Sequence, residues 1–93
     1  MALRMRAKDL VAWNLRRLRV RSGLSQEALA VDAGVDRTYV SRVERALENP
    51  TVGALEKIAS ALEAPIAEFF RVPTRTEKLP ATLPAGRKKR AMK

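Results

Sequence analysis

Hydrophobic residues near the start of the chain recur at the spacing of an α-helix. Val11, Leu15 and Leu18 follow one another at intervals of four and three, which places them on one helical face. The arginines of this stretch fall on other faces, and Gly23 is a typical residue for ending a helix. The pattern therefore predicts a first helix over residues 8–22.

Two short helices are predicted next, over residues 25–44, with Gly34 in the turn between them. Ser25 and Asp36 stand where N-cap residues are expected, because their short polar side chains can accept a hydrogen bond from the first helical turn. At each cap, the residue one position before it and the residue four positions after it are hydrophobic, which is the spacing of a hydrophobic staple. Two short helices joined by such a turn have the spacing that is typical of a helix-turn-helix motif.

A fourth and a fifth helix are predicted after Asn49-Pro50. Thr51 starts the fourth helix, and its inward-facing residues are Leu55, Ile58, Ala59 and Leu62. Pro65 suits the first position of a short fifth helix that carries two phenylalanines. Since no segment alternates with period two, we expect an all-α fold.

Composition changes at both ends of this helical region. Residues 8–72 carry a net charge of +1, whereas residues 1–7 add +2 and residues 73–93 add +6, for a total of +9. Prolines and a glycine interrupt the last segment. We therefore expect a basic N-terminal extension over 1–7, a folded domain over 8–72 and a flexible basic tail over 73–93.

Composition also excludes several kinds of site. The 93 residues include no Cys and no His, which removes thiol chemistry, the commonest metal ligands and the commonest general base. We expect no metal, no cofactor and no evident small-molecule ligand, and an enzyme is disfavoured. No apolar run approaches the roughly 20 residues that span a bilayer, and the start does not resemble a secretory signal. A cytoplasmic location is expected, with no membrane partner.

The solvent-facing side of the third predicted helix contains no acidic residue. It is made of Arg37, Thr38, Ser41, Arg42 and Arg45. An ordinary solvated face usually mixes Glu with Lys, so an acid-free face favours contact with nucleic acid. The alternative is a plain helical hairpin with a solvated face.

Residues 15–70 resemble the Cro/C1-type helix-turn-helix family of bacterial and phage repressors, also called the XRE family. The motifs that carry the resemblance are Leu24-Ser25-Gln26-Glu27, Leu29-Ala30, Gly34, Val40-Ser41, Val43-Glu44-Arg45 and Asn49-Pro50-Thr51. The segment from Asp36 to Ser41 is also similar to restriction–modification controller proteins. The resemblance implies a five-helix, lambda-repressor-like domain with the helix-turn-helix at helices 2 and 3.

One position departs from the family pattern. Ala46 stands where the family usually has Gly after the Glu-Arg pair. Because a left-handed conformation is costly for Ala, the third helix could instead run on toward Leu47.

The resemblance also assigns roles to individual residues. The residues implied to contact DNA are Gln26, Arg37, Thr38, Ser41, Arg42, Arg45, Asn49 and Thr51. The first positions of the third helix, together with Ser41 and Arg42, would face bases and nearby phosphates, and the others would face phosphates. For Gln26 the alternative is a solvated surface position. Asp36 is better explained as a cap, and Tyr39 suits either packing or contact.

In this family the residues matching Arg19 and Glu44 form a buried ion pair between the first and third helices. The resemblance implies that pair here, and the alternative is two unrelated surface charges. Neither residue is expected to contact DNA.

These observations favour a sequence-specific regulator, a repressor or controller, that binds palindromic double-stranded DNA as a homodimer. The dimer contact is expected near Ile66 and Phe69. The alternative is an antitoxin or adaptor of the same fold whose main role is to bind a protein partner. A non-specific RNA binder is disfavoured because aromatic stacking platforms are scarce.

Overall fold

The computed structural model describes residues 5–74 and 76–78. Four α-helices and one short 3-10 helix occur in this part of the chain. They are α1 (Ala7–Arg21), α2 (Gln26–Ala33), α3 (Arg37–Glu44), α4 (Val52–Leu62) and η1 (Ile66–Phe70). The described residues contain no strand, in agreement with the all-α prediction.

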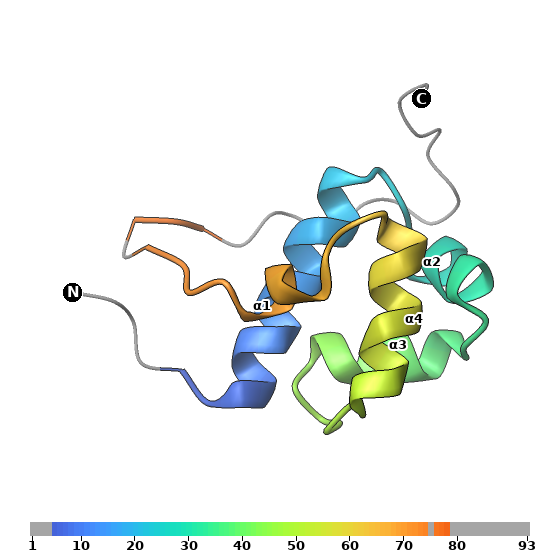
Figure 1. Ribbon diagram of the computed structural model, residues 1–93, viewed down its shortest axis with the longest axis horizontal. Coiled ribbons are helices and arrows are strands. Elements are labelled where there is room, and N and C mark those ends of the chain that lie inside the picture. Colours follow the sequence, from blue (N-terminus) through green and yellow to red (C-terminus); the bar gives the residue numbers. More distant parts are fainter. Residues whose placement is uncertain (1–4, 75, 79–93) are drawn as a thin grey trace.

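One hydrophobic core joins all five elements. In Figure 1, η1 lies against α1, and α4 packs on α2 and η1, while α3 packs on both α1 and α2. Leu15, Leu29, Val40, Ile58 and Phe69, one from each element, are all fully buried. The predicted inward face of α4 is also buried along its whole length. The core therefore fixes the position of α3 against α1 and α2.

Two of the three predicted N-caps make the expected hydrogen bond. Ser25 Oγ accepts from the Ala28 amide at 3.0 Å, and Thr51 Oγ1 accepts from the Ala54 amide at the same distance. Asp36 occupies the N-cap position of α3, but its side chain makes no capping hydrogen bond. The negative charge of its carboxylate still interacts favourably with the positive, N-terminal end of the α3 dipole.

Each of the four α-helices ends at a residue in the left-handed conformation. The residues are Gly23, Gly34, Ala46 and Glu63, with φ between 55° and 74°. In every case the following amide donates to a carbonyl five residues back, which is the Schellman arrangement. The suggestion that α3 might run on toward Leu47 is therefore wrong. The Leu47 amide bonds the Arg42 carbonyl at 2.8 Å and offsets the cost of the left-handed Ala46.

The fifth predicted α-helix is a single 3-10 segment, η1, so the five-helix count is corrected to four α-helices in the described residues. Pro65 is its N-cap in extended conformation rather than its first helical residue. The segment is only five residues long, and tight i to i+3 bonding suits such short pieces.

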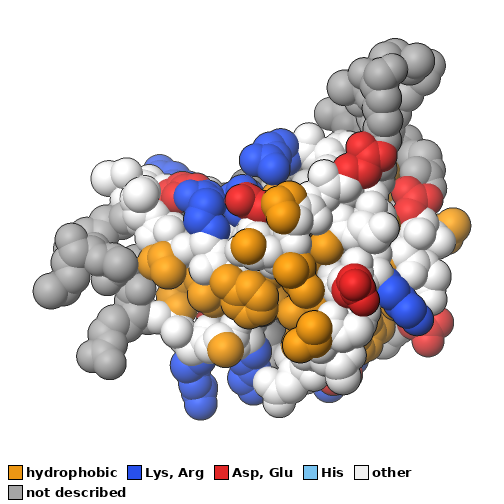
Figure 2. Space-filling view, viewed as in Figure 1, with side chains coloured by type: hydrophobic (Ala, Val, Ile, Leu, Met, Phe, Trp, Pro, Cys, Tyr) orange, Lys and Arg blue, Asp and Glu red, His pale blue; other side chains and the backbone are white. Residues whose placement is uncertain are grey.

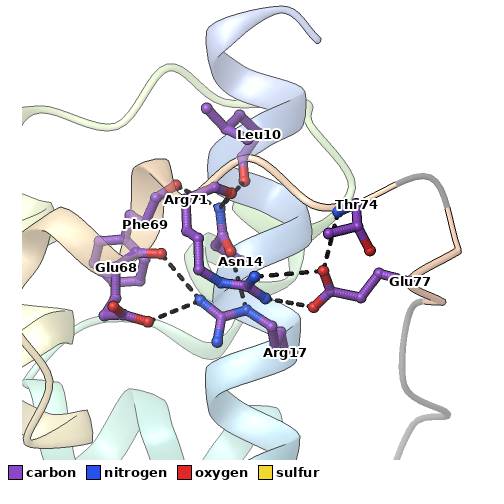
Figure 3. Close-up of polar contacts among 8 residues, drawn as sticks. All are labelled: Leu10, Asn14, Arg17, Glu68, Phe69, Arg71, Thr74 and Glu77. Carbon is purple, nitrogen blue, oxygen red and sulfur yellow. Dashed lines mark hydrogen bonds and ion pairs between the residues drawn. The ribbon is translucent and has the colours of Figure 1, made fainter. Parts of the chain in front are cut away.

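Buried polar side chains on α1 attach η1 and the chain beyond it (Figure 3). Asn14 Nδ2 donates to the carbonyls of Phe69 and Arg71 at 2.9 and 2.8 Å. Arg17 Nε donates to Asn14 Oδ1 at 3.0 Å, and its Nη2 lies 3.1 Å from Glu68 Oε1. These bonds satisfy backbone groups that would otherwise be buried without partners.

The fold continues past the boundary expected at Val72. Pro73 is fully buried, and Arg71 forms an ion pair with Glu77. The Arg71 guanidinium lies 5.8 Å from the centre of the Trp13 ring, and its hydrogen bond holds the pKa of the Glu77 carboxyl below the ordinary value. Pro73 and Glu77 thus both make contacts with the folded domain. The rest of the predicted tail, 79–93, and most of the predicted N-terminal extension, 1–4, lie outside the described residues.

Candidate nucleic-acid interface

The exposed face of α3 carries the residues that sequence reasoning selected for DNA contact. Val40 and Val43 point inward and are 0% and 1% exposed. Arg37, Thr38, Arg42 and Arg45 are exposed on the other side of the helix and Ser41 is half-buried. No acidic side chain lies on α3 between its first residue and the buried Glu44. The packing thus presents a cationic and hydroxyl-bearing surface to solvent.

Arg19 and Glu44 form the buried ion pair that the resemblance implied. Their side chains are 2% and 4% exposed, and Arg19 Nε and Nη2 lie 2.5 and 3.1 Å from the two Glu44 oxygens. Arg19 Nη1 also donates to the Leu24 carbonyl at 2.8 Å. Because the pair joins α1 to the end of α3 and to the chain before α2, it fixes how the helix-turn-helix sits on the domain.

Gln26, the first residue of α2, is attached to this pair. Its Nε2 donates to Glu44 Oε1 at 3.2 Å, and the residue is half-buried rather than free in solvent. An amide nitrogen has two hydrogens, so one remains to donate to an acceptor outside the protein. This arrangement is compatible with the phosphate contact that the resemblance implied.

The residues between α3 and α4 form the edge of this surface. Asn49 and Thr51 are exposed, and although Thr51 Oγ1 caps α4 as an acceptor, its O–H can still donate. Tyr39 is half-buried and packs against the core, so packing accounts for part of its role. Burial, together with the nearby Glu48 carboxylate, raises the pKa of the Tyr39 phenol. An open hollow of about 650 Å³ separates the starts of α3 and α4 beside this ring.

Glu48 is a functional candidate that sequence reasoning missed. Arg42 Nε donates to Glu48 Oε2 at 3.0 Å, and Arg42 Nη2 donates to the Leu47 carbonyl at 3.1 Å. Both side chains are partly exposed, at 45% and 35%. Helical spacing gives no signal for this contact, because Glu48 follows the left-handed turn at Ala46 and lies outside α3.

The predicted dimer contact requires a correction at one residue. Phe69 is 0% exposed and belongs to the domain's own core, so its ring has no surface to offer a second copy. Ile66, Phe70 and Val72 are 36%, 46% and 44% exposed. We call these three residues the η1 apolar patch. Figure 2 shows hydrophobic side chains gathered across the middle of the face in view, where η1 lies beside α1 and α4.

Among the described residues, no group of three or more acidic side chains is placed to hold a metal ion. No helix in this part of the chain is long and apolar enough to cross a membrane.

Known proteins are similar to this chain in sequence and in fold. Residues 10–69 match a family model described as a helix-turn-helix domain. A hypothetical transcription factor of Neisseria meningitidis is 43% identical over 72 residues, which cover 77% of this chain and 68% of the relative. Control protein C.SmaI of Serratia marcescens is 40% identical over 66 residues, which cover 71% of this chain and 79% of that protein.

Solved structures of other proteins also resemble this chain in fold. The restriction-modification controller protein C.AhdI from Aeromonas hydrophila superposes with a TM-score of 0.66 at 41% identity, covering 68% of this chain and 96% of that chain. The Neisseria factor superposes with a TM-score of 0.71 at 41% identity, covering 73% of this chain and 78% of its own.

Proposed function

The chain belongs to the Cro/C1-type helix-turn-helix transcriptional regulators, which bind DNA, and we propose that it recognises a palindromic operator as a homodimer. The observation that carries the proposal is the exposed, acid-free face of α3, held at a fixed angle by the buried pair of Arg19 and Glu44. A protein of this kind acts on the chromosome, so we propose a cytoplasmic, nucleoid-associated location and a role as repressor or controller.

Base reading is assigned to the first two turns of α3. An α-helix fits the major groove, where Arg recognises the O6 and N7 atoms of guanine through two hydrogen bonds. Arg37 and Arg42 are exposed and suit this role, with Thr38 and Ser41 beside them as hydroxyl donors. Arg45, at the end of the helix, suits a phosphate.

Phosphate contacts are assigned to the ends of the neighbouring helices. Gln26 starts α2 and Thr51 caps α4, and the first backbone amides of a helix favour an anion. Asn49 precedes Thr51 in the exposed connection. Such contacts fix the register of the protein on the duplex without reading sequence.

Substitution of the two reading arginines should change sequence preference. Arg37→Ala or Arg42→Ala is expected to cost about 1–3 kcal/mol on the preferred site and to relax discrimination at one base position. Arg45→Ala, the matched control, should weaken all duplexes by similar factors. The measurement is binding to the preferred duplex and to its single-base variants, after selection of that duplex from a randomised pool. Unchanged preference in both variants would mean that this face does not read bases.

A homodimer is proposed because α3 is short, and two copies on a palindrome double the number of base contacts. The two half-site centres would then lie about one helical turn, roughly 34 Å, apart. The η1 apolar patch supplies a surface for the second copy that leaves α3 free, since η1 packs mainly on α1 and α4.

A charge placed in the η1 apolar patch should separate the dimer. Phe70→Asp is expected to give a monomer in sedimentation experiments and to weaken binding to a palindrome by at least about 100-fold, because linked half-sites gain that much from avidity. Val31→Asp is the matched control, since Val31 is 70% exposed on α2. A wild-type protein that stays monomeric both free and on DNA would contradict the homodimer.

A further inference from the structure

Arg42 is held at two points by the connection that follows its own helix. Its Nε–H donates to Glu48 Oε2 at 3.0 Å and its Nη2 donates to the Leu47 carbonyl at 3.1 Å. The Leu47 amide in turn donates to the Arg42 carbonyl at 2.8 Å. This closed arrangement depends on the left-handed Ala46, which turns the chain back beside α3.

Two bonds to one guanidinium fix both its position and its plane. A guanidinium has five N–H donors in a rigid fork, and these bonds occupy one on Nε and one on Nη2. Within the described residues, the structure gives Nη1 no partner, so both of its hydrogens and one on Nη2 stay available. The available hydrogens include those of the outer Nη1–Nη2 edge, which can donate in parallel to two acceptors.

We propose that Glu48 is a specificity-determining positioning residue, which orients Arg42 so that its outer edge meets the O6 and N7 atoms of one guanine. The inference rests on the proposed function, in that Arg42 must face a base. Glu48 itself touches no DNA in this arrangement and acts through Arg42.

The negative charge of Glu48 has a second effect, which acts on binding to DNA of any sequence. A carboxylate that is 35% exposed beside a DNA-binding face repels phosphates of any sequence. Glu48 therefore lowers affinity for random duplexes while it strengthens the contact with one base pair. Both effects increase discrimination, which is the quantity that a regulator needs in a genome of competing sites.

The experiment compares Glu48→Ala and Glu48→Gln in the full-length chain. Ala removes both the hydrogen bond to Arg42 and the charge, whereas Gln removes the charge and keeps an acceptor for Arg42 Nε. Binding is measured on the preferred duplex, on its single-base variants and on random duplex. Glu63→Ala and Glu63→Gln are matched controls, because Glu63 ends α4 and lies outside the proposed interface.

Glu48→Ala should tighten binding to random duplex by a few-fold and reduce preference at a single G·C position by about 5- to 100-fold. Glu48→Gln should tighten random binding to a similar extent while keeping most of that preference. In an Arg42→Ala background, Glu48→Ala should no longer change preference at that position. Thermal unfolding of each variant checks that the domain remains folded.

Three results would overturn the proposal. If Glu48→Ala tightens the preferred site and leaves base preference intact, Glu48 restrains Arg42 rather than positioning it. If it changes binding no more than Glu63→Ala, Glu48 has no specific role. If Arg42→Ala leaves preference unchanged while other sites of the duplex are still discriminated, the inference fails and the regulator function stands. A wild-type chain without any preferred duplex would instead remove the proposed function itself.

Discussion

Glu44→Gln is expected to lower the free energy of unfolding by about 3–5 kcal/mol, because it leaves the Arg19 guanidinium charged and buried without an anion. The Arg19 side chain is only 2% exposed, and besides Glu44 it donates a hydrogen bond to the Leu24 carbonyl. Arg cannot lose its proton to escape the penalty. Chemical denaturation with urea at neutral pH measures the loss.

Two comparisons test whether the loss comes from the buried pair. Replacing both partners, as in Arg19→Met with Glu44→Leu, should restore much of the stability, because no unpaired charge is left behind. Glu48→Gln, which removes the negative charge from the exposed pair with Arg42, should cost less than about 1 kcal/mol. A double-mutant cycle with a coupling energy near zero would contradict the assignment. Loss of the pair should also release Gln26, so DNA affinity at low temperature is a second readout.

Removal of residues 79–93 is expected to weaken binding to specific and random duplexes by similar factors. This segment contains five basic residues and no acid, whereas residues 8–72 carry only +1. Each phosphate that a basic side chain neutralises contributes about 0.9 to the slope of log affinity against log salt. The slope should therefore become shallower by up to about 4.5 if all five residues contact DNA.

The truncation belongs after Lys78 and not after Val72. Pro73 is buried and Glu77 pairs with Arg71, so the shorter chain would lose contacts of the folded domain. A matched variant keeps the length and replaces Arg87, Lys88, Lys89 and Arg90 with Ser, which separates charge from chain length. An unchanged salt slope in both variants would show that the segment does not contact DNA. A loss confined to the preferred site would show that it reads sequence.

Local chemistry made the helical segments predictable. Ser25, Thr51 and Gly34 act through bonds or backbone angles within their own turn, and each has the role that its residue type indicates. The buried pair of Arg19 and Glu44 was available through the family resemblance, since no local rule connects residues 25 positions apart. The exposed face of α3 was predicted from helical spacing, and the resemblance assigned roles to its residues.

Features that depend on tertiary packing were not predictable in this way. Phe69 and Phe70 are adjacent and chemically identical, and only the docking of η1 on α1 decides which one is buried. The end of α3 was also uncertain, because a left-handed Ala46 is unfavourable alone and is stabilised by the bond from Leu47 to Arg42. The position of Glu48 depends on that turn, and so the contact with Arg42 was missed.

The abrupt end of α3 limits how much sequence one copy of the protein can distinguish. A helix of eight residues is about 12 Å long and runs past about three to four base pairs of B-DNA. A four-base-pair word recurs by chance about once in 256 base pairs, so one copy alone would find thousands of equivalent addresses on a chromosome of a few million base pairs. Two copies reading eight base pairs would reduce the chance recurrence to about once in 65,000 base pairs, which leaves tens of addresses. Because the left-handed Ala46 ends α3, it limits the number of base pairs that each copy of the protein can read.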